Sequence, residues 1–110
     1  MEIGIIGFGY VGKAMDSVLS PHYKVRTYDT NGNGSSTKVE DVIKKSEVIF
    51  VCVPTPMKKD GSCDTSIVEK VISGINKTAK GKWYNPDSEL KTVVIKSTVP
   101  PGTTERLNCI

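Results

Sequence analysis

The chain has 110 residues, enough for one domain with a single hydrophobic core and too few for two domains of ordinary size. Hydrophobic residues make up 37% of it and charged residues 25%, a composition that excludes collagen-like, disordered and coiled-coil proteins. No apolar run approaches the roughly 18 residues that a membrane-spanning helix needs. No basic leader precedes the first apolar residues, so we expect a cytoplasmic protein without a membrane partner.

The charged residues and cysteines argue against two further classes of protein. The net charge is +3, and the lysines are scattered in ones and twos rather than gathered with aromatic side chains, so we expect no nucleic-acid partner. The three cysteines, Cys52, Cys63 and Cys109, are far apart, and the single histidine, His22, follows a proline. This spacing predicts neither a disulfide framework nor a metal site.

The first half of the chain alternates between strand and helix patterns. Residues 3–6 and 24–28 predict strands. Between them lies a predicted helix that ends at Ser20 and whose inward face comprises Val11, Ala14, Met15, Val18 and Leu19. A polar, glycine-rich segment over 31–36 follows. Thr37 and Glu40 then have the spacing of a capping box, which predicts a short helix with three inward residues, Val39, Val42 and Ile43.

The second half continues the alternation. Residues 48–53 are apolar throughout, which is typical of a strand buried on both faces of a parallel sheet. A polar loop over 58–62 follows, and Asp64 or Ser66 can cap a helix with Ile67, Val68, Val71, Ile72 and Ile75 inward. We expect a loop over 81–91, a fourth strand over 92–95, a turn over 97–102 and a helix starting at Thr103.

This order of elements predicts an α/β fold in a single domain. Strands separated by helices imply right-handed crossovers and an open parallel sheet. We therefore expect a Rossmann-like, doubly wound parallel sheet of about four strands in the order 2-1-3-4. The order reverses between the first and third strands, which is where doubly wound sheets bind their ligands.

A glycine-rich run lies at this reversal. Residues 7–12 read Gly-Phe-Gly-Tyr-Val-Gly and connect the first strand to the first helix, the context that the dinucleotide-binding fingerprint requires. Gly7 permits the tight turn, Gly9 lets the backbone approach a pyrophosphate, and Gly12 allows the helix to pack closely on the sheet. The helix N-terminus adds unpaired N–H groups and the positive end of the helix dipole.

An acidic residue completes the pattern. Asp29 ends the second strand about 20 positions after Gly9, where a carboxylate can accept hydrogen bonds from an adenosine ribose. Thr30 and Asn31 follow it, with no arginine for a 2′-phosphate, so the predicted cofactor is NAD rather than NADP.

Two further turns follow strands at the same edge of the predicted sheet. The first contains Thr55, and the second contains Ser97 and Thr98. Prolines stiffen both turns and place these hydroxyl groups over the cleft. Serine and threonine also form local turns and helix caps, so the residues by themselves leave a structural role and a ligand-binding role equally open.

Three stretches together resemble the N-terminal domain of the UDP-glucose/GDP-mannose dehydrogenase family. They are residues 3–12, residues 50–56 with 60–64, and residues 96–104. Val-Pro-Thr-Pro with Asp-Gly-Ser, and Ser-Thr-Val-Pro-Pro-Gly-Thr, are more specific than the glycine run, which many dehydrogenases share. Members of the family oxidise the C6 alcohol of a nucleotide sugar to a carboxylate with two NAD⁺. The resemblance implies that residues 1–110 are an NAD-binding domain, an N-terminal part of a longer enzyme.

The resemblance also implies which residues hold the cofactor. Residues 7–12 would form the pyrophosphate loop with Val11 touching the cofactor, Asp29 would bind the adenosine ribose, and Thr55 would lie beside the cofactor. Thr98 would lie near the nicotinamide and help to hold a catalytic water, so it is the one catalytic residue expected. The expected cofactor-binding residues are Gly7, Phe8, Gly9, Tyr10, Val11, Gly12, Asp29, Thr55 and Thr98.

The chain departs from the family pattern in three respects. The family has a basic residue about five positions after its ribose-binding aspartate and then a longer helical segment, whereas here Gly34 stands in a short loop. An Asn-Pro-Glu stretch is absent. The catalytic lysine, asparagine and cysteine, and the domains for dimerisation and sugar-nucleotide binding, are expected beyond residue 110. The chain should therefore orient the cofactor without turning over a sugar nucleotide such as UDP-glucose, and a homodimer is expected only for a full-length form.

Two other functions remain open at this point. One is the N-terminal domain of a hydroxyacid or 6-phosphogluconate-type dehydrogenase, which the short middle segment favours and the substrate loop beginning at Ser97 disfavours. The other is a non-enzymatic nucleotide-sensing module, which would need no further domain.

Overall fold

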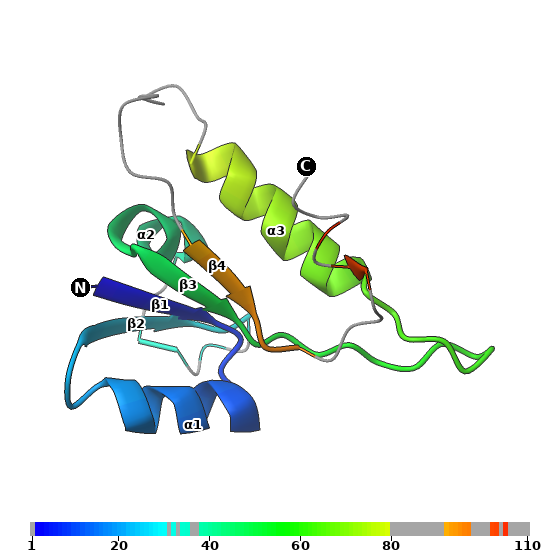
Figure 1. The fold of residues 1–110 in the computed structure, drawn as a ribbon, viewed down its shortest axis with the longest axis horizontal. Helices are drawn as coiled ribbons and strands as arrows, with labels where there is room; N and C mark the ends of the chain where they lie inside the picture. Colours follow the sequence, from blue (N-terminus) through cyan, green and yellow to red (C-terminus); the bar gives the residue numbers. More distant parts are fainter. Residues whose placement is uncertain are drawn as a thin grey trace.

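The computed structural model of the chain describes residues 2–30, 32, 34–35, 38–79, 92–97, 102–103 and 105. In chain order these residues form β1 (Glu2–Ile6), α1 (Tyr10–Leu19), β2 (Lys24–Tyr28), α2 (Val39–Lys45), β3 (Val48–Val51), α3 (Ser66–Ala79) and β4 (Thr92–Ile95) (Figure 1). The predicted alternation of strands and helices is confirmed.

The four strands form one parallel sheet in the order β2-β1-β3-β4, as predicted. Ile6 at the end of β1 is level with Tyr28 of β2 and Val51 of β3, and Val51 is level with Ile95 of β4. The carboxyl ends of all four strands therefore lie along one edge. Helix α1 covers one face of the sheet, and α2 and α3 cover the other (Figure 1).

The main core lies between the sheet and the pair α2 and α3. It consists of Ile6, Val42, Ile43, Ile49, Val51 and Ile75. The inward residues predicted for α2 are confirmed, since Val42 and Ile43 are buried and Val39 packs against the core. In α3 the prediction is wrong for Ile67, which is 38% exposed. Its neighbour Val68 faces the core, and consecutive helical residues point about 100° apart.

Helix α1 buries less of its apolar face than its sequence predicts. Gly12 is its one buried residue, whereas Val11 is 46% exposed, Val18 is 68% exposed and Ala14 is also exposed. The helix packs against β1 and β2. A single helix over half of a four-stranded sheet touches that sheet along a narrow line, so the flanks of its apolar stripe face outward.

Strand β3 is shorter and less buried than predicted. It ends at Val51 rather than at residue 53. Ile49 and Val51 are buried under α2 and α3, but Val48 and Phe50 point to the other face and are half-buried. The predicted burial on both faces is therefore wrong for the face that carries Val48 and Phe50. On that face α1 lies over β1 and β2 and leaves β3 partly uncovered.

Between β2 and α2, Gly34 and Ser35 lie along the outer edge of β2. The Ser35 hydroxyl accepts a hydrogen bond from the Thr27 N–H (3.0 Å), and the Ser35 N–H donates to Thr27 Oγ1 (2.7 Å). A Cβ on Gly34 would lie 2.7 Å from the Tyr28 Cα, so only glycine fits there. These contacts occupy hydrogen-bonding groups that an edge strand otherwise exposes.

The predicted cap of α3 is confirmed, and that of α2 stays a prediction. Lys38 precedes α2 and makes no side-chain capping bond, and Thr37, on which the predicted capping box depends, lies outside the described residues. At the start of α3, Asp64 Oδ1 accepts a hydrogen bond from the Ser66 N–H at 2.9 Å. Hydrogen bonds from Ser66 hold the pKa of Asp64 below its usual value. None of the helices in the described part of the chain is both long and apolar enough to cross a membrane.

Replacement by alanine should change the stability of the protein in opposite directions at two helical glycines, Gly12 and Gly74. In Gly12→Ala the new methyl group would overlap the carbonyl oxygen of Gly7, so the free energy of unfolding should fall by about 1–3 kcal/mol. In Gly74→Ala the methyl group meets nothing within 4 Å, so the free energy of unfolding should rise by about 0.5–1 kcal/mol. Urea denaturation followed by circular dichroism measures both. A Gly12→Ala protein as stable as the parent would contradict the close packing.

Candidate cofactor-binding site

The turn after β1 is held between the ends of two other strands. Gly7 has a φ of +96°, a conformation that disfavours every residue with a side chain. Its N–H donates to the carbonyl oxygen of Tyr28 at 2.8 Å. On the other side, a Cβ on Gly7 would lie 2.7 Å from the backbone of Cys52. A side chain is therefore excluded by both the conformation and the space.

The two other glycines of the run have the geometry that the sequence predicts for them. Gly12 is buried, and a Cβ on it would overlap the carbonyl oxygen of Gly7 and lie 3.4 Å from Ile5 Cγ2, so α1 starts in close contact with the end of β1. Gly9 is exposed, and a Cβ on it would meet nothing within 4 Å. The space beside its backbone is open, as the approach of a pyrophosphate requires.

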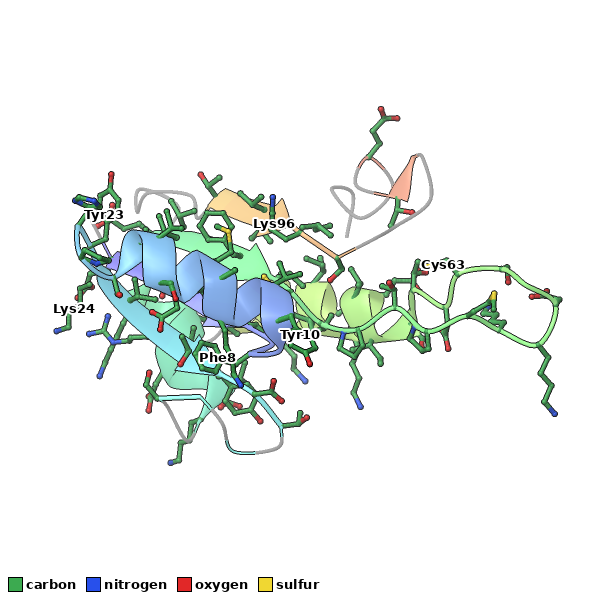
Figure 2. The ribbon with its side chains drawn as sticks, turned by 90° about the horizontal axis from the view of Figure 1, so that it is seen from below. Phe8, Tyr10, Tyr23, Lys24, Cys63 and Lys96 are labelled. Atoms are coloured by element: carbon green, nitrogen blue, oxygen red, sulfur yellow. The ribbon has the colours of Figure 1, made fainter. Side chains whose placement is uncertain are left out.

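The N-terminus of α1 offers backbone donors to this open space. Gly9 is the N-cap and makes no side-chain capping bond, and the first turn contains no acidic residue. The first helical bond runs from the Lys13 N–H to the Gly9 carbonyl oxygen at 2.9 Å. Amide groups earlier in the turn have no acceptor within the helix, and they lie at the positive end of its dipole. Phe8 and Tyr10 mark this end of α1, opposite Tyr23 and Lys24 (Figure 2).

Asp29, the residue predicted to bind the adenosine ribose, lies against the glycine run. Asp29 Oδ2 accepts a hydrogen bond of 2.6 Å from the Phe8 N–H, across 21 positions of sequence. The Gly32 N–H donates to the Asp29 carbonyl oxygen at 3.0 Å, so the chain turns directly after the aspartate. The carboxylate and the glycine run therefore form one surface at the point where the strand order reverses.

Beyond β3 the chain forms a hairpin over residues 56–64, which projects from the carboxyl edge of the sheet (Figures 1 and 2). The Asp64 N–H donates to the Pro56 carbonyl oxygen (2.8 Å), and the Lys58 N–H donates to that of Ser62 (2.7 Å). The polar loop predicted over 58–62 is thus the turn of a hairpin. Its sequence of mixed polar residues carries no alternating pattern that indicates paired arms.

The sequence predicts that the hydroxyl groups of Thr55, Ser97 and Thr98 lie over the cleft, and the structure describes two of these three residues. The Ser97 hydroxyl donates to the Val53 carbonyl oxygen at 2.6 Å, so it bridges the ends of β4 and β3 rather than projecting over a cleft. Thr55 is half-buried on the segment that leaves β3. Thr98 lies outside the described residues, so its role as a catalytic residue stays a prediction.

Cys52 is the half-buried thiol directly after β3. Burial raises the pKa of Cys52, and the positive charge of Lys96, at the end of β4, offsets part of that rise. The thiol is therefore protonated near neutral pH and behaves as a small apolar side chain. Among the described residues, no group of three or more His, Cys, Asp or Glu side chains could hold a metal ion.

This geometry defines a class of protein. A parallel sheet with a glycine turn, a helix N-terminus and a strand-end carboxylate meeting at its switch point is a dinucleotide-binding unit of the Rossmann type. Residues 24–110 match the family model for the UDP-glucose/GDP-mannose dehydrogenase family, NAD binding domain. The chain belongs to this family as its NAD-binding domain, and NAD is the cofactor.

Similar proteins share this part of their length. The chain is 38% identical over 138 residues to the GDP-mannose 6-dehydrogenase of Pseudomonas aeruginosa, covering 94% of this chain and 30% of that protein. It is 29% identical over 137 residues to the UDP-N-acetyl-D-mannosamine dehydrogenase of Methanococcus maripaludis, covering 96% and 30%. A solved ternary complex of the P. aeruginosa GDP-mannose dehydrogenase matches with a TM-score of 0.79 and 27% identity, covering 97% and 30%.

The chain is shorter than these relatives, both overall and within the aligned region. The chain spans less than a third of the length of the relatives it matches, with 30% covered in each of two relatives. The alignments also run over 138 and 137 positions, more than the 110 residues of the chain, so the relatives carry residues within the aligned region that this chain lacks. This agrees with the shortened segment after Asp29 that the family resemblance indicates.

The pH dependence of Cys52 alkylation tests the electrostatics at the end of β3. In a Cys63→Ser, Cys109→Ser background, alkylation by iodoacetamide should be slow at pH 7 and reach half its maximal rate above the pH found for a free cysteine, because burial raises the pKa. Lys96→Ala should move this midpoint further upward, since it removes the charge that lowers the pKa. Lys44→Ala on α2 serves as the control and should leave the midpoint unchanged. A downward shift in Lys96→Ala would contradict this assignment of charges.

Proposed function

We propose that residues 1–110 are the domain that holds NAD in a nucleotide-sugar 6-dehydrogenase, through residues 7–12, Asp29, Thr55 and Thr98. The observation that carries the proposal is the 2.6 Å hydrogen bond between the Phe8 N–H and Asp29, which lies directly beside the open glycine loop. A carboxylate oriented in this way, next to unpaired helix amides, suits a ligand with a diol at one position and a diphosphate at the next.

The pyrophosphate is proposed to lie over Gly9 at the N-terminus of α1. The open space beside Gly9 supports this placement, because a phosphate must come within hydrogen-bond distance of the backbone. The exposed side chains of Tyr10 and Val11 flank the same end of the helix. In this arrangement Val11 touches the cofactor and the main chain supplies the phosphate donors.

Asp29 is proposed to accept hydrogen bonds from the adenosine ribose. A carboxylate at this position favours a free 2′-hydroxyl and repels a 2′-phosphate, and Thr30 and Gly32 beside it bring no positive charge. The domain should therefore prefer NAD over NADP.

The substrate of the full protein is proposed to be a nucleotide sugar such as UDP-glucose, bound mainly by residues outside this chain. Bound NAD supplies the hydride acceptor for oxidation of the C6 alcohol to the acid. Residues of this chain orient the cofactor, and Thr98 holds the water for the second oxidation. The family match supports this function over that of a hydroxyacid or 6-phosphogluconate-type dehydrogenase. The proposed setting is polysaccharide biosynthesis in the cytoplasm.

Replacement of Asp29 tests the ribose contact. Titration calorimetry of the parent should show NAD binding at least about tenfold tighter than NADP, and Asp29→Asn should weaken NAD binding by about tenfold or more, the loss expected for hydrogen bonds to a charged group. Asp41→Asn, on the exposed surface of α2, is the matched control and should bind NAD as the parent does. Unchanged NAD affinity in Asp29→Asn, or a parent that prefers ATP, would refute the proposal.

Replacement of Gly9 tests the pyrophosphate contact separately. Gly9→Ala should weaken the binding of both NAD and ADP by about tenfold, because its methyl group occupies the space proposed for the phosphates. Its stability to urea should change little, since that methyl group meets no protein atom within 4 Å. Equal affinities in the parent and Gly9→Ala would place the diphosphate elsewhere.

A further inference from the structure

Strands β3 and β4 separate just beyond their last paired residues, Val51 and Ile95. The Val51 carbonyl oxygen accepts the N–H groups of both Lys96 (2.8 Å) and Ser97 (3.2 Å), which ends the backbone pairing. From here the segment after β3 leads to Thr55, which is proposed to lie beside the cofactor, and the segment after β4 continues to Ser97. The backbone pairing of β3 and β4 therefore stops before it reaches Thr55.

The Ser97 side chain extends the connection past this point. Its hydroxyl oxygen lies 3.4 Å from the Val51 carbonyl oxygen and 2.6 Å from that of Val53, which is the short, well-formed hydrogen bond. The bond crosses 44 positions of sequence. It joins the two diverging segments two residues further along than the backbone pairing does.

The segment after Val53 is stiff, so anchoring Val53 also orients residues 54–56. Pro54 and Pro56 each have a fixed φ, and Val53 and Thr55, as residues that precede proline, are restricted to extended conformations. With few free torsions between them, the position of the Val53 carbonyl group determines where Thr55 lies.

We propose that Ser97 is a positioning residue, whose hydroxyl bond to Val53 holds the segment that carries Thr55 beside the nicotinamide half of the cofactor. This inference rests on the proposed function. The adenosine and pyrophosphate contacts lie on the other side of β1, at Gly9 and Asp29, and do not depend on Ser97. Loss of the hydroxyl should therefore affect one half of NAD and leave the other unchanged.

The test is titration calorimetry with two probes, NAD and ADP, where ADP carries the adenosine and diphosphate groups alone. Ser97→Ala should weaken NAD binding by about three- to tenfold and leave ADP binding unchanged. Ser97→Thr keeps a hydroxyl group and should restore the NAD binding that Ser97→Ala loses. Ser97→Val has nearly the same shape as Ser97→Thr but no hydroxyl group, and it should not restore NAD binding. Ser73→Ala on the exposed surface of α3 is the control and should match the parent with both probes.

A second measurement asks whether Ser97 acts through Thr55. In a Thr55→Val background, Ser97→Ala should weaken NAD binding by clearly less than it does in the parent, because the residue it positions is already lost. The Ser97→Thr and Ser97→Val pair gives the same comparison with the side-chain volume preserved, should Ser97→Ala fold poorly.

The outcomes separate this inference from the proposed function. A parent that fails to bind NAD overturns both. A parent that binds NAD with unchanged affinity in Ser97→Ala and Ser97→Val overturns the role of Ser97 alone. Equal losses for NAD and ADP would show a general structural role and would also overturn it.

Discussion

The close approach of three strand ends at Gly7 is the constraint on which the rest of the site depends. The Gly7 N–H bonds to the end of β2, its Cα lies against the backbone that follows β3, and its carbonyl oxygen lies against Gly12 of α1. No side chain fits at Gly7 or at Gly12. This contact fixes where α1 begins and which way its N-terminal amides point, so the position of the proposed pyrophosphate site follows directly from backbone packing.

Main-chain groups then orient the polar side chains around this junction. The Phe8 N–H holds the Asp29 carboxylate, and the Val53 carbonyl group holds the Ser97 hydroxyl, with distances of 2.6 Å in both cases. One bond lies on the β2 side of β1 and the other between β3 and β4. The strand order thus separates the proposed adenosine contacts from the proposed nicotinamide contacts, although both lie along the same edge of the sheet.

The short connection after Asp29 still packs closely against β2. Ser35 pairs with Thr27 through hydroxyl and backbone groups, and Gly34 lies directly against Tyr28. The Thr27 N–H and hydroxyl group on the outer edge of β2 thereby both have a partner in Ser35.

Sequence reasoning reached the strand order, the roles of Gly7 and Gly12 in the fold, the inward residues of α2 and the family, because each leaves a local pattern of spacing or residue type. It was wrong about the apolar face of α1 and about β3, since the burial of a periodic pattern depends on what lies opposite it. It also left Ser97 undecided and gave no sign of the Phe8–Asp29 bond. Those contacts join residues 44 and 21 positions apart, and only the packing of the strands determines which carbonyl or amide group a side chain meets.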